Sequence, residues 1–160
     1  YAQLNVLDTH DVSRFLSVCN ENVANYKLAV VFQMTFPGMP SIFYGDEKGI
    51  SGIMEEEYRS PMKWEESHEL FEFYQKLITL RKQEEALRGG DYSTVLAESG
   101  SRLYVFERST EEESIRIFIN MEEHEVDISE LAANYTPMLV QGFDQKVLSA
   151  KGFVIMKREG

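Results

Sequence analysis

The sequence is poor in cysteine, with Cys19 as the single thiol among 160 residues. One thiol cannot form an internal disulfide or a multi-cysteine metal cluster, so a disulfide-stabilised secreted scaffold is excluded. The sequence also lacks an apolar run long enough to cross a bilayer, and its first residues lack the basic start and apolar stretch of a signal peptide. We therefore expect no membrane partner and a reducing, cytoplasmic location.

Positive charge is scarce as well, because 16 Lys and Arg residues face 27 Asp and Glu residues. The resulting formal net charge of -11 repels phosphate backbones and anionic lipid surfaces, so nucleic acid is not an expected partner. The hydrophobic fraction of 43% is sufficient for a buried core. We expect a globular chain that contains one domain, or one small domain and part of another.

The first half of the sequence alternates between strand and helix patterns. Residues 4–7 form a short apolar run that predicts a buried parallel strand, and residues 41–44 form a second one. Apolar positions recur at helical spacing in residues 22–36 and again in residues 67–82. Residues 48–66 have no clear period and predict a long irregular connection. The order strand, helix, strand, helix is typical of an α/β architecture.

The second half, from Gly89-Gly90 onward, consists of short β-rich segments separated by turn residues. Strands are predicted at residues 92–97, 103–108, 115–120, 136–140 and 153–157. Several short strands in succession favour an antiparallel β-sandwich, which gives two domains, residues 1–88 and residues 89–160. The acidic run Glu111-Glu112-Glu113 predicts a solvated hairpin tip.

The densest group of chemically versatile side chains follows the first predicted strand, as Asp8-Thr9-His10-Asp11 with Arg14 nearby. In a parallel α/β barrel, the carboxyl ends of the strands hold the active site. A carboxylate can accept hydrogen bonds from two adjacent sugar hydroxyls, and an imidazole can reach a third. Taken alone, the pair is weak evidence, because acids and histidines are common in exposed loops.

Four stretches in order along the first half strengthen this interpretation. They are Asn5–Asp11 with Arg14-Phe15, Pro40–Glu47, Tyr58–Trp64 and Leu77–Lys82. The four resemble segments of the α-amylase family of glycoside hydrolases, in the form found in neopullulanases, cyclomaltodextrinases and maltogenic amylases. The resemblance implies that residues 1–88 are the last two strand–helix units of a (β/α)8 barrel. It also implies that residues 89–160 are the antiparallel β-sandwich that follows the barrel.

The resemblance assigns roles to the residues that match the family motifs. Asp11 would be the third family carboxylate, which binds hydroxyls of the sugar next to the scissile bond and stabilises the transition state. His10 would help to hold the same sugar. Asp46, Arg59 and Glu55 would bind substrate or support the wall of the site. For Asp46 and Arg59, a structural ion pair that anchors the loop is an equally weighted alternative.

Other positions favour a structural interpretation or depart from the family pattern. Asp8 is better interpreted as a strand-end or capping acid, and Tyr44 and Trp64 as packing aromatics rather than sugar platforms. Val12 stands where relatives have threonine or serine. Glu55-Glu56-Glu57-Tyr58 stands where relatives commonly show aspartate, proline, aspartate and cysteine. The longer Glu55 side chain therefore makes the details of sugar binding and the enzyme subtype harder to assign.

The sequence lacks segments that resemble those of the family's nucleophile and general acid. A retaining glycosidase needs these two carboxyl groups about 5–5.5 Å apart, and in this family both come from earlier barrel strands. We therefore expect a C-terminal part of a longer enzyme, inactive alone, whose parent hydrolyses α-1,4 or α-1,6 bonds of maltooligosaccharides, cyclodextrins or pullulan. No metal or cofactor is indicated, and calcium is an option for the parent only.

Two other functions are open at this point. A non-catalytic carbohydrate-binding or interaction module would use residues 89–160, but the aromatic residues there form no obvious exposed row. A non-hydrolytic transporter subunit from the same family would be expected to lose His10 and Asp11, and this sequence has both. Two strand–helix units also leave a barrel edge uncovered, so the missing chain, a homo-oligomeric partner or rearranged packing should cover it.

Overall fold

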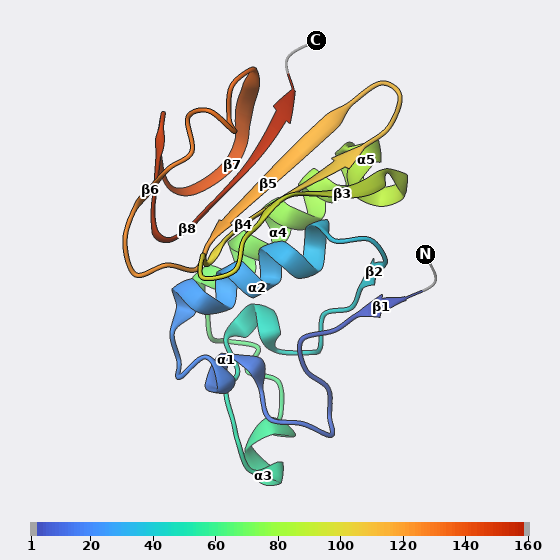
Figure 1. Ribbon diagram of the computed structural model, residues 1–160. Coiled ribbons are helices and arrows are strands. Elements are labelled where there is room, and N and C mark those ends of the chain that lie inside the picture. Colours follow the sequence, from blue (N-terminus) through green and yellow to red (C-terminus); the bar gives the residue numbers. More distant parts are fainter. Residues whose placement is uncertain (1–2, 159–160) are drawn as a thin grey trace. The chain divides into compact units, whose positions relative to one another are not determined.

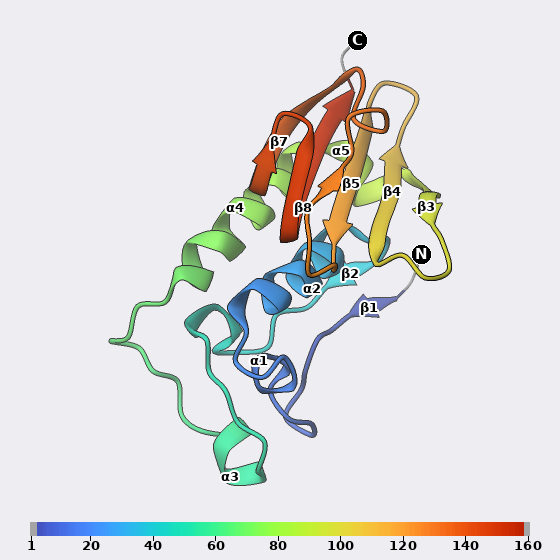
Figure 2. The ribbon, with the colours of Figure 1, turned by 60° about the vertical axis from the view of Figure 1, so that its left-hand side comes forward.

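The computed structural model describes residues 3–158 and divides into two compact units. One unit comprises the chain up to Met34 together with Gly38–Gln83, and the other comprises Thr35–Pro37 together with the chain from Glu84 onward. Helices and two short strands make up the first unit, and a strongly curved sheet dominates the second (Figures 1 and 2). The four family-like stretches therefore all lie in the first unit.

The first unit contains a short pair of parallel strands. Strand β1, Leu4–Asn5, pairs with β2, Met39–Pro40. The Arg81 side chain fixes the approach to β2, because it donates hydrogen bonds to the carbonyl oxygens of Met34 and Gly38, each at 2.6 Å. The parallel pairing agrees with the sequence analysis, but the first strand is shorter than residues 4–7 and Leu4 is 61% exposed, so the prediction of a buried strand was wrong. The prediction of a strand at residues 41–44 was also wrong.

Local hydrogen bonds explain why no strand forms at residues 41–44. The Ser41 amide still donates to the carbonyl of Asn5, at 2.9 Å. Beyond it, the amide of Phe43 donates to the Asp46 carboxylate at 3.1 Å, and the carbonyl of Tyr44 accepts from Arg14 at 2.7 Å. These side chains satisfy backbone groups that a β-ladder would otherwise pair, and the chain turns into a short 3₁₀ helix.

Two long helices carry the core of this unit. Helix α2, Val23–Thr35, begins after Asn22, whose side-chain oxygen accepts the Asn25 amide at 3.0 Å in an N-cap. Helix α4, Glu69–Gln83, corresponds to the helical period predicted at residues 67–82. The hydroxyl groups of Tyr26 on α2 and Tyr74 on α4 are buried and 2.9 Å apart. Both predicted helices are confirmed.

Two single-turn helices occupy segments that the sequence analysis left irregular. They are α1, Phe15–Val18, and α3, Glu55–Tyr58. In α3, the carboxylate of Glu57 accepts the amides of Met54 at 3.0 Å and Ile53 at 2.8 Å, and these bonds lower the pKa of Glu57. Side-chain hydrogen bonds thus fix the start of a helix too short to show a hydrophobic period.

The second unit is an antiparallel sheet of six strands. They are β3 Asp91–Ala97, β4 Leu103–Ser109, β5 Ser114–Asn120, β6 Val126–Asp127, β7 Tyr135–Asp144 and β8 Val147–Arg158. The order is β3-β4-β5-β8-β6, and β7 also pairs with β8. The predicted β-sandwich is therefore corrected to one continuously hydrogen-bonded, curled sheet. Helix α5, Glu85–Gly89, belongs to this unit, although the sequence pattern had grouped it with the first.

The long strand β8 explains why the sheet is continuous. Its first residues pair with β6 and its later residues pair with β5, while β7 follows it along most of its length. Between these stretches Lys151 has a left-handed backbone, with φ of 52°, and Gly152 approaches the Gln141 carbonyl too closely for a side chain. The bend lets β8 pair with β6 near its start and with β5 further along. The enclosed core consists of Leu103, Val105, Phe118, Ile128, Ala132, Tyr135, Leu148, Val154 and Met156.

Two polar clusters in this unit were not expected. Arg108 is buried and donates to four backbone carbonyls, of Asp91, Thr35, Leu87 and Gly90, at 2.7–3.3 Å. A charged side chain inside the unit is stabilised because these four N–H groups each meet a carbonyl oxygen.

The acidic run at the β4–β5 turn is only partly solvated, which corrects the prediction of a solvated tip. The Glu113 side chain is 13% exposed. Its carboxylate accepts the amide of Ala86 and, at 2.8 Å, the ammonium group of Lys157, which also contacts Glu84 at 2.7 Å. Glu111 and Glu112 are exposed, as expected for a hairpin tip.

Candidate functional site

The candidate site lies in the first unit, where the loop that leaves β1 meets α3 (Figures 1 and 2). We call residues 9–14 the exit loop. Arg59, directly after α3, donates from Nε to the carbonyl oxygen of His10 at 2.8 Å and from Nη2 to Asp11 Oδ1 at 3.3 Å. Its Nη1 lies 2.6 Å from Glu55 Oε1. One guanidinium therefore joins two segments separated by 48 residues in sequence.

The four side chains of this group are accessible to solvent. Their exposed fractions are 67% for His10, 65% for Asp11, 45% for Arg59 and 61% for Glu55. His10 Nε2 lies 3.3 Å from Asp11 Oδ2, so each Asp11 oxygen faces a nitrogen. Exposed ion pairs of this kind contribute little to stability, and their exposure leaves the oxygen and nitrogen atoms free to exchange partners with a ligand.

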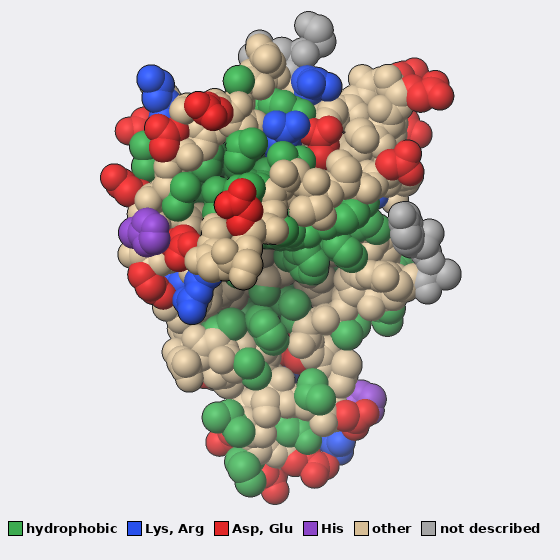
Figure 3. Space-filling view, viewed as in Figure 1, with side chains coloured by type: hydrophobic (Ala, Val, Ile, Leu, Met, Phe, Trp, Pro, Cys, Tyr) green, Lys and Arg blue, Asp and Glu red, His purple; other side chains and the backbone are tan. Residues whose placement is uncertain are grey.

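Apolar side chains surround this polar group. Val12 is 49% exposed, Ile53 63% and Met54 62%. Figure 3 shows the corresponding surface around α3, where acidic, basic and histidine side chains lie beside hydrophobic ones. A surface that combines hydrogen-bonding groups with apolar patches suits a polyol, whose ring carries hydroxyls at its edge and C–H groups on its faces.

A second charged cluster lies beneath the exit loop and is almost completely buried. Asp8 and Asp46 are each 3% exposed, and Arg14 is 0% exposed. Arg14 Nη1 contacts Asp46 Oδ1 at 3.2 Å, and its guanidinium stacks on the rings of Phe43 and Tyr44, 4.3 and 4.7 Å from their centroids. Burial and stacking hold Arg14 in one orientation.

The two buried acids shape the local electrostatics. Burial raises the pKa of Asp46, the neighbouring Asp8 carboxyl adds to this rise, and Arg14 partly opposes both effects, which together place the pKa at about 8. Asp8 Oδ2 accepts the amide of Phe15 at 2.7 Å, which satisfies the first N–H of α1. The interpretation of Asp8 as a capping acid is thus confirmed.

The structure brings together four of the five predicted site residues and separates the fifth. His10, Asp11, Glu55 and Arg59 form the exposed group, and their roles toward a sugar stay predictions. Asp46 lies apart from them, in a buried ion pair with Arg14, a partner that the sequence analysis did not name. A ligand on the exposed group would therefore not reach the Asp46 carboxylate, because it is covered.

Sequence reasoning missed the role of Arg14, which appeared only as part of a motif. Besides Asp46, its side chain donates to the carbonyls of Tyr44 at 2.7 Å and Tyr58 at 3.0 Å, and its amide donates to Gly52 at 2.9 Å. Carbonyl partners carry no sequence signal, so the pattern could not have revealed them. A basic residue amid apolar neighbours, Phe15 and Leu16, was the available hint.

The two aromatics singled out from the sequence behave differently. Tyr44 packs with one side only: its ring lies 4.6 Å from that of Phe43 and its hydroxyl donates to the Ser60 carbonyl at 2.9 Å, while 41% of the residue is exposed. Trp64 is 75% exposed, which contradicts the expectation that it packs. The indole ring of Trp64 is consequently accessible to solvent in the first unit.

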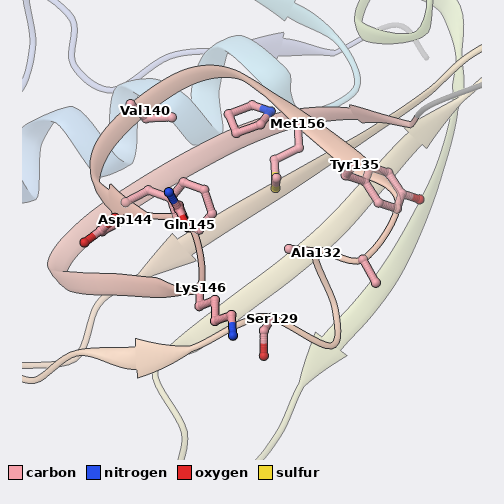
Figure 4. A pocket seen from close by; sticks show the side chains of 11 residues that line it. Ser129, Ala132, Tyr135, Val140, Asp144, Gln145, Lys146 and Met156 are labelled. Atoms are coloured by element: carbon pink, nitrogen blue, oxygen red, sulfur yellow. The ribbon is translucent and has the colours of Figure 1, made fainter.

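The second unit has an open pocket of about 600 Å³ between β7, β8 and the segment that precedes β7. Met156, Ala132 and Tyr135 form its apolar interior, while Lys146 and Ser129 lie at its edge (Figure 4). The aromatic rings of Phe106 and Phe118 in this unit are 0% exposed, so these two are not available to stack on a sugar.

Within residues 3–158, no group of three or more His, Cys, Asp or Glu side chains is arranged to hold a metal ion. Over the same range, no helix has the length and apolar character needed to span a bilayer.

Comparison with known proteins gives consistent matches. Residues 1–69 match the family described as alpha amylase, catalytic domain. Neopullulanase 2 of Thermoactinomyces vulgaris is 42% identical over 119 residues, which are 72% of this chain and 20% of that protein. A cyclomaltodextrinase of Thermoanaerobacter pseudethanolicus is 41% identical over 119 residues, 72% of this chain and 20% of its own length. The chain thus spans about a fifth of the length of these curated relatives.

Solved structures agree with the sequence matches. The acarbose-soaked debranching enzyme of Nostoc punctiforme superposes with a TM-score of 0.82 at 30% identity, over 97% of this chain and 33% of that chain. A cyclomaltodextrinase structure gives a TM-score of 0.82 at 30% identity, over 99% of this chain and 30% of that one. Both units of the chain therefore have counterparts within single known proteins.

Proposed function

Since this chain belongs to the α-amylase family of glycoside hydrolases, we propose that it is part of a retaining enzyme that cleaves α-glucosidic bonds. The substrates that we propose are maltooligosaccharides, cyclodextrins or pullulan, with α-1,4 and α-1,6 linkages. One observation carries the proposal. In the exit loop that follows β1, a strand with a parallel neighbour, Arg59 holds the exposed carboxylate of Asp11 beside His10 by donating to Asp11 and to the His10 carbonyl.

Asp11 has the role of transition-state stabiliser in this proposal. Its two oxygens accept hydrogen bonds from adjacent hydroxyls of the sugar at the scissile bond, and these bonds strengthen as positive charge develops on the ring. His10 donates to a hydroxyl of the same sugar. Both side chains are more than half exposed, which supports direct contact with substrate.

Arg59 and Glu55 bind the neighbouring part of the substrate. Arg59 has 45% of its side chain exposed while its contacts to His10 and Asp11 fix its position, so it can orient Asp11 and still meet a hydroxyl. Glu55 lies on the far side of the guanidinium, at 2.6 Å, and can accept from a sugar further along the chain. Asp46 has no direct contact with substrate in this arrangement.

The bond-cleaving carboxyl groups belong to other segments of the enzyme, so the chain alone is inactive. A general acid needs a raised pKa and access to the glycosidic oxygen. Asp46 has a raised pKa but is 3% exposed, and it cannot protonate a bound substrate. Asp11 is exposed and lies between His10 and Arg59, and in this proposal its two oxygens accept from sugar hydroxyls instead of carrying a proton to the leaving group.

Product stereochemistry tests this proposal. The full-length enzyme is incubated with maltoheptaose, and proton NMR follows the first anomer released. We expect the α-anomer first, as retention requires, and no sugar release by the isolated 160-residue chain. Initial release of the β-anomer, or hydrolysis by the isolated chain, would overturn the proposal.

A further inference from the structure

The buried cluster of Asp8, Asp46 and Arg14 has one cation for two carboxyl groups. All three side chains are at most 3% exposed, so water screens them poorly. If both acids were ionised, the cluster would carry a net negative charge inside the unit, which is costly. One bound proton makes the cluster neutral, with one carboxylate for the guanidinium.

The hydrogen bonds indicate where such a proton belongs. Three of the four carboxyl oxygens already accept an N–H group. Asp8 Oδ2 accepts from Phe15, Asp46 Oδ1 from Arg14 and Asp46 Oδ2 from Phe43. The fourth, Asp8 Oδ1, is buried and has no hydrogen-bond partner among the described residues. An acid proton between the two carboxyl groups gives this atom the partner that it lacks.

We propose that Asp8 and Asp46 share one proton, and that this acid pair, together with Arg14, is the positioning element that holds His10 and Asp11 in place. The part that concerns catalysis rests on the proposed glucan-hydrolase function, whereas the shared proton does not. Neither carboxyl group touches substrate, so Asp8 and Asp46 act through the exit loop.

The geometry of the exit loop explains how the pair positions it. Asp8 lies directly before the loop and binds Phe15 directly after it, so one carboxyl group fastens both ends. Arg14, the last loop residue, is tied to the carbonyls of Tyr44 and Tyr58. His10 and Asp11 therefore project from a loop closed at its base, and loss of the proton would push the two carboxylates at that base apart.

Other titratable groups face the pair without supplying a second cation. Tyr26 on α2 and Tyr74 on α4 lie close enough for their pKa values to be raised by Asp46 and Asp8, after the larger effect of burial. Both phenols therefore stay neutral. Glu47 adds negative charge near Tyr74. Within the described residues, Arg14 is the cation in ion-pair contact with either acid.

A carboxyl titration tests the shared proton directly. The full-length enzyme is labelled with ¹³C at the aspartate carboxyl carbons, and their NMR shifts are followed with pH. We expect an aspartate step near pH 8 in the wild type, and its loss in Asp8→Asn and in Asp46→Asn. The Asp8→Asn variant retains an oxygen for Phe15 and places a permanent N–H donor toward Asp46. Complete ionisation of all wild-type aspartates by about pH 6 would overturn the proposal.

Kinetics of the full-length enzyme test the positioning role. At pH values above the titration step, wild-type kcat should fall, while Asp8→Asn, which cannot lose its donor, should keep kcat to higher pH. Asp8→Ala should lower kcat on the order of 100-fold, with a smaller change in KM, because a displaced Asp11 affects the transition state most. Glu72→Gln, an exposed carboxyl change on α4, is the matched control.

The outcomes separate the two proposals. An Asp8→Ala enzyme with wild-type kcat and an unchanged pH profile would contradict the positioning role. A wild-type enzyme without activity on any α-glucan would defeat the proposed function, whereas the NMR step near pH 8 would still establish the shared proton. If Asp8→Asn fails to fold, the wild-type titration and Asp46→Asn decide the result.

Discussion

Arg59 Nε donates a hydrogen bond to the main-chain carbonyl of His10 at 2.8 Å, across 49 positions of sequence. The contact joins the end of α3 to the exit loop through the backbone, so it does not depend on which side chain occupies position 10. Arg59 also reaches the Asp11 carboxylate, at 3.3 Å. The guanidinium therefore orients a loop and a carboxylate at the same time.

The first prediction concerns this dual contact. Arg59→Lys keeps the positive charge but loses the planar set of donors, so it cannot bind the His10 carbonyl, Asp11 and Glu55 together. We expect kcat/KM of the full-length enzyme on a cyclodextrin to fall about tenfold, as for loss of one charged hydrogen bond. Lys63→Ala, which removes a nearby exposed cation, is the control. Equal activity of Arg59→Lys and wild type would refute the assignment.

The second prediction concerns stability and pH. The pKa of Asp46 in the folded chain, about 8, lies above its ordinary value of 3.8, so the folded state holds the proton more tightly. This contribution to stability is complete below the ordinary pKa and is lost as pH rises through about 8. Urea unfolding of wild type and Asp46→Asn at about pH 5 and about pH 9 measures it. Wild type should lose more stability than the variant; parallel losses would contradict the account.

The third prediction concerns the second unit. Arg108→Met retains a long apolar stem but leaves four carbonyl oxygens without their donor. The free energy of unfolding should fall by at least about 3 kcal/mol, since each unsatisfied buried group costs about 1–3 kcal/mol. Arg102→Met, at an exposed position just before β4, serves for comparison. If both changes cost the same, the carbonyl contacts do not stabilise the unit.

The fourth prediction concerns Glu113 at the β4–β5 turn. Burial raises its pKa, but the amide of Ala86 and the ammonium group of Lys157 outweigh burial and lower it. A lowered pKa contributes stability above the ordinary value and loses it as pH falls. Glu113→Gln should therefore reduce the melting temperature at neutral pH, with the difference vanishing at about pH 3, whereas Glu112→Gln should change little. A difference that persists in acid would point to packing instead of charge.

The sequence predicted those parts of the fold that depend on local pattern. The 3.6-residue period located α2 and α4; α4 buries one face, whereas α2 is buried or half-buried along nearly all of its length. The strand expected at residues 41–44 did not form, since the nearby Asp46 side chain and the Arg14 side chain, which is distant in sequence, satisfy its backbone groups. The expected sandwich became one sheet, since the bend at Lys151 and Gly152 lets β8 pair with several partners.

The candidate site, like the fold, was predictable only in part. Motif matching brought out His10, Asp11, Glu55 and Arg59, which the fold brings together. It also grouped Asp46 with them, because a motif records residue type and spacing but not burial. Arg14 and Arg108 bind mainly backbone carbonyls, and such partners leave no trace in residue identity.

The central claim is that Asp11 acts on the sugar at the scissile bond, and single-turnover kinetics of Asp11→Asn in the full-length enzyme test it most directly. The variant keeps the size and the hydrogen-bonding oxygen of the side chain but loses the negative charge. With Glu56→Gln, an exposed change on α3, as the matched control, we expect the chemical step on maltoheptaose to slow about 10²–10³-fold in Asp11→Asn alone. A chemical step at the wild-type rate in Asp11→Asn would contradict the account.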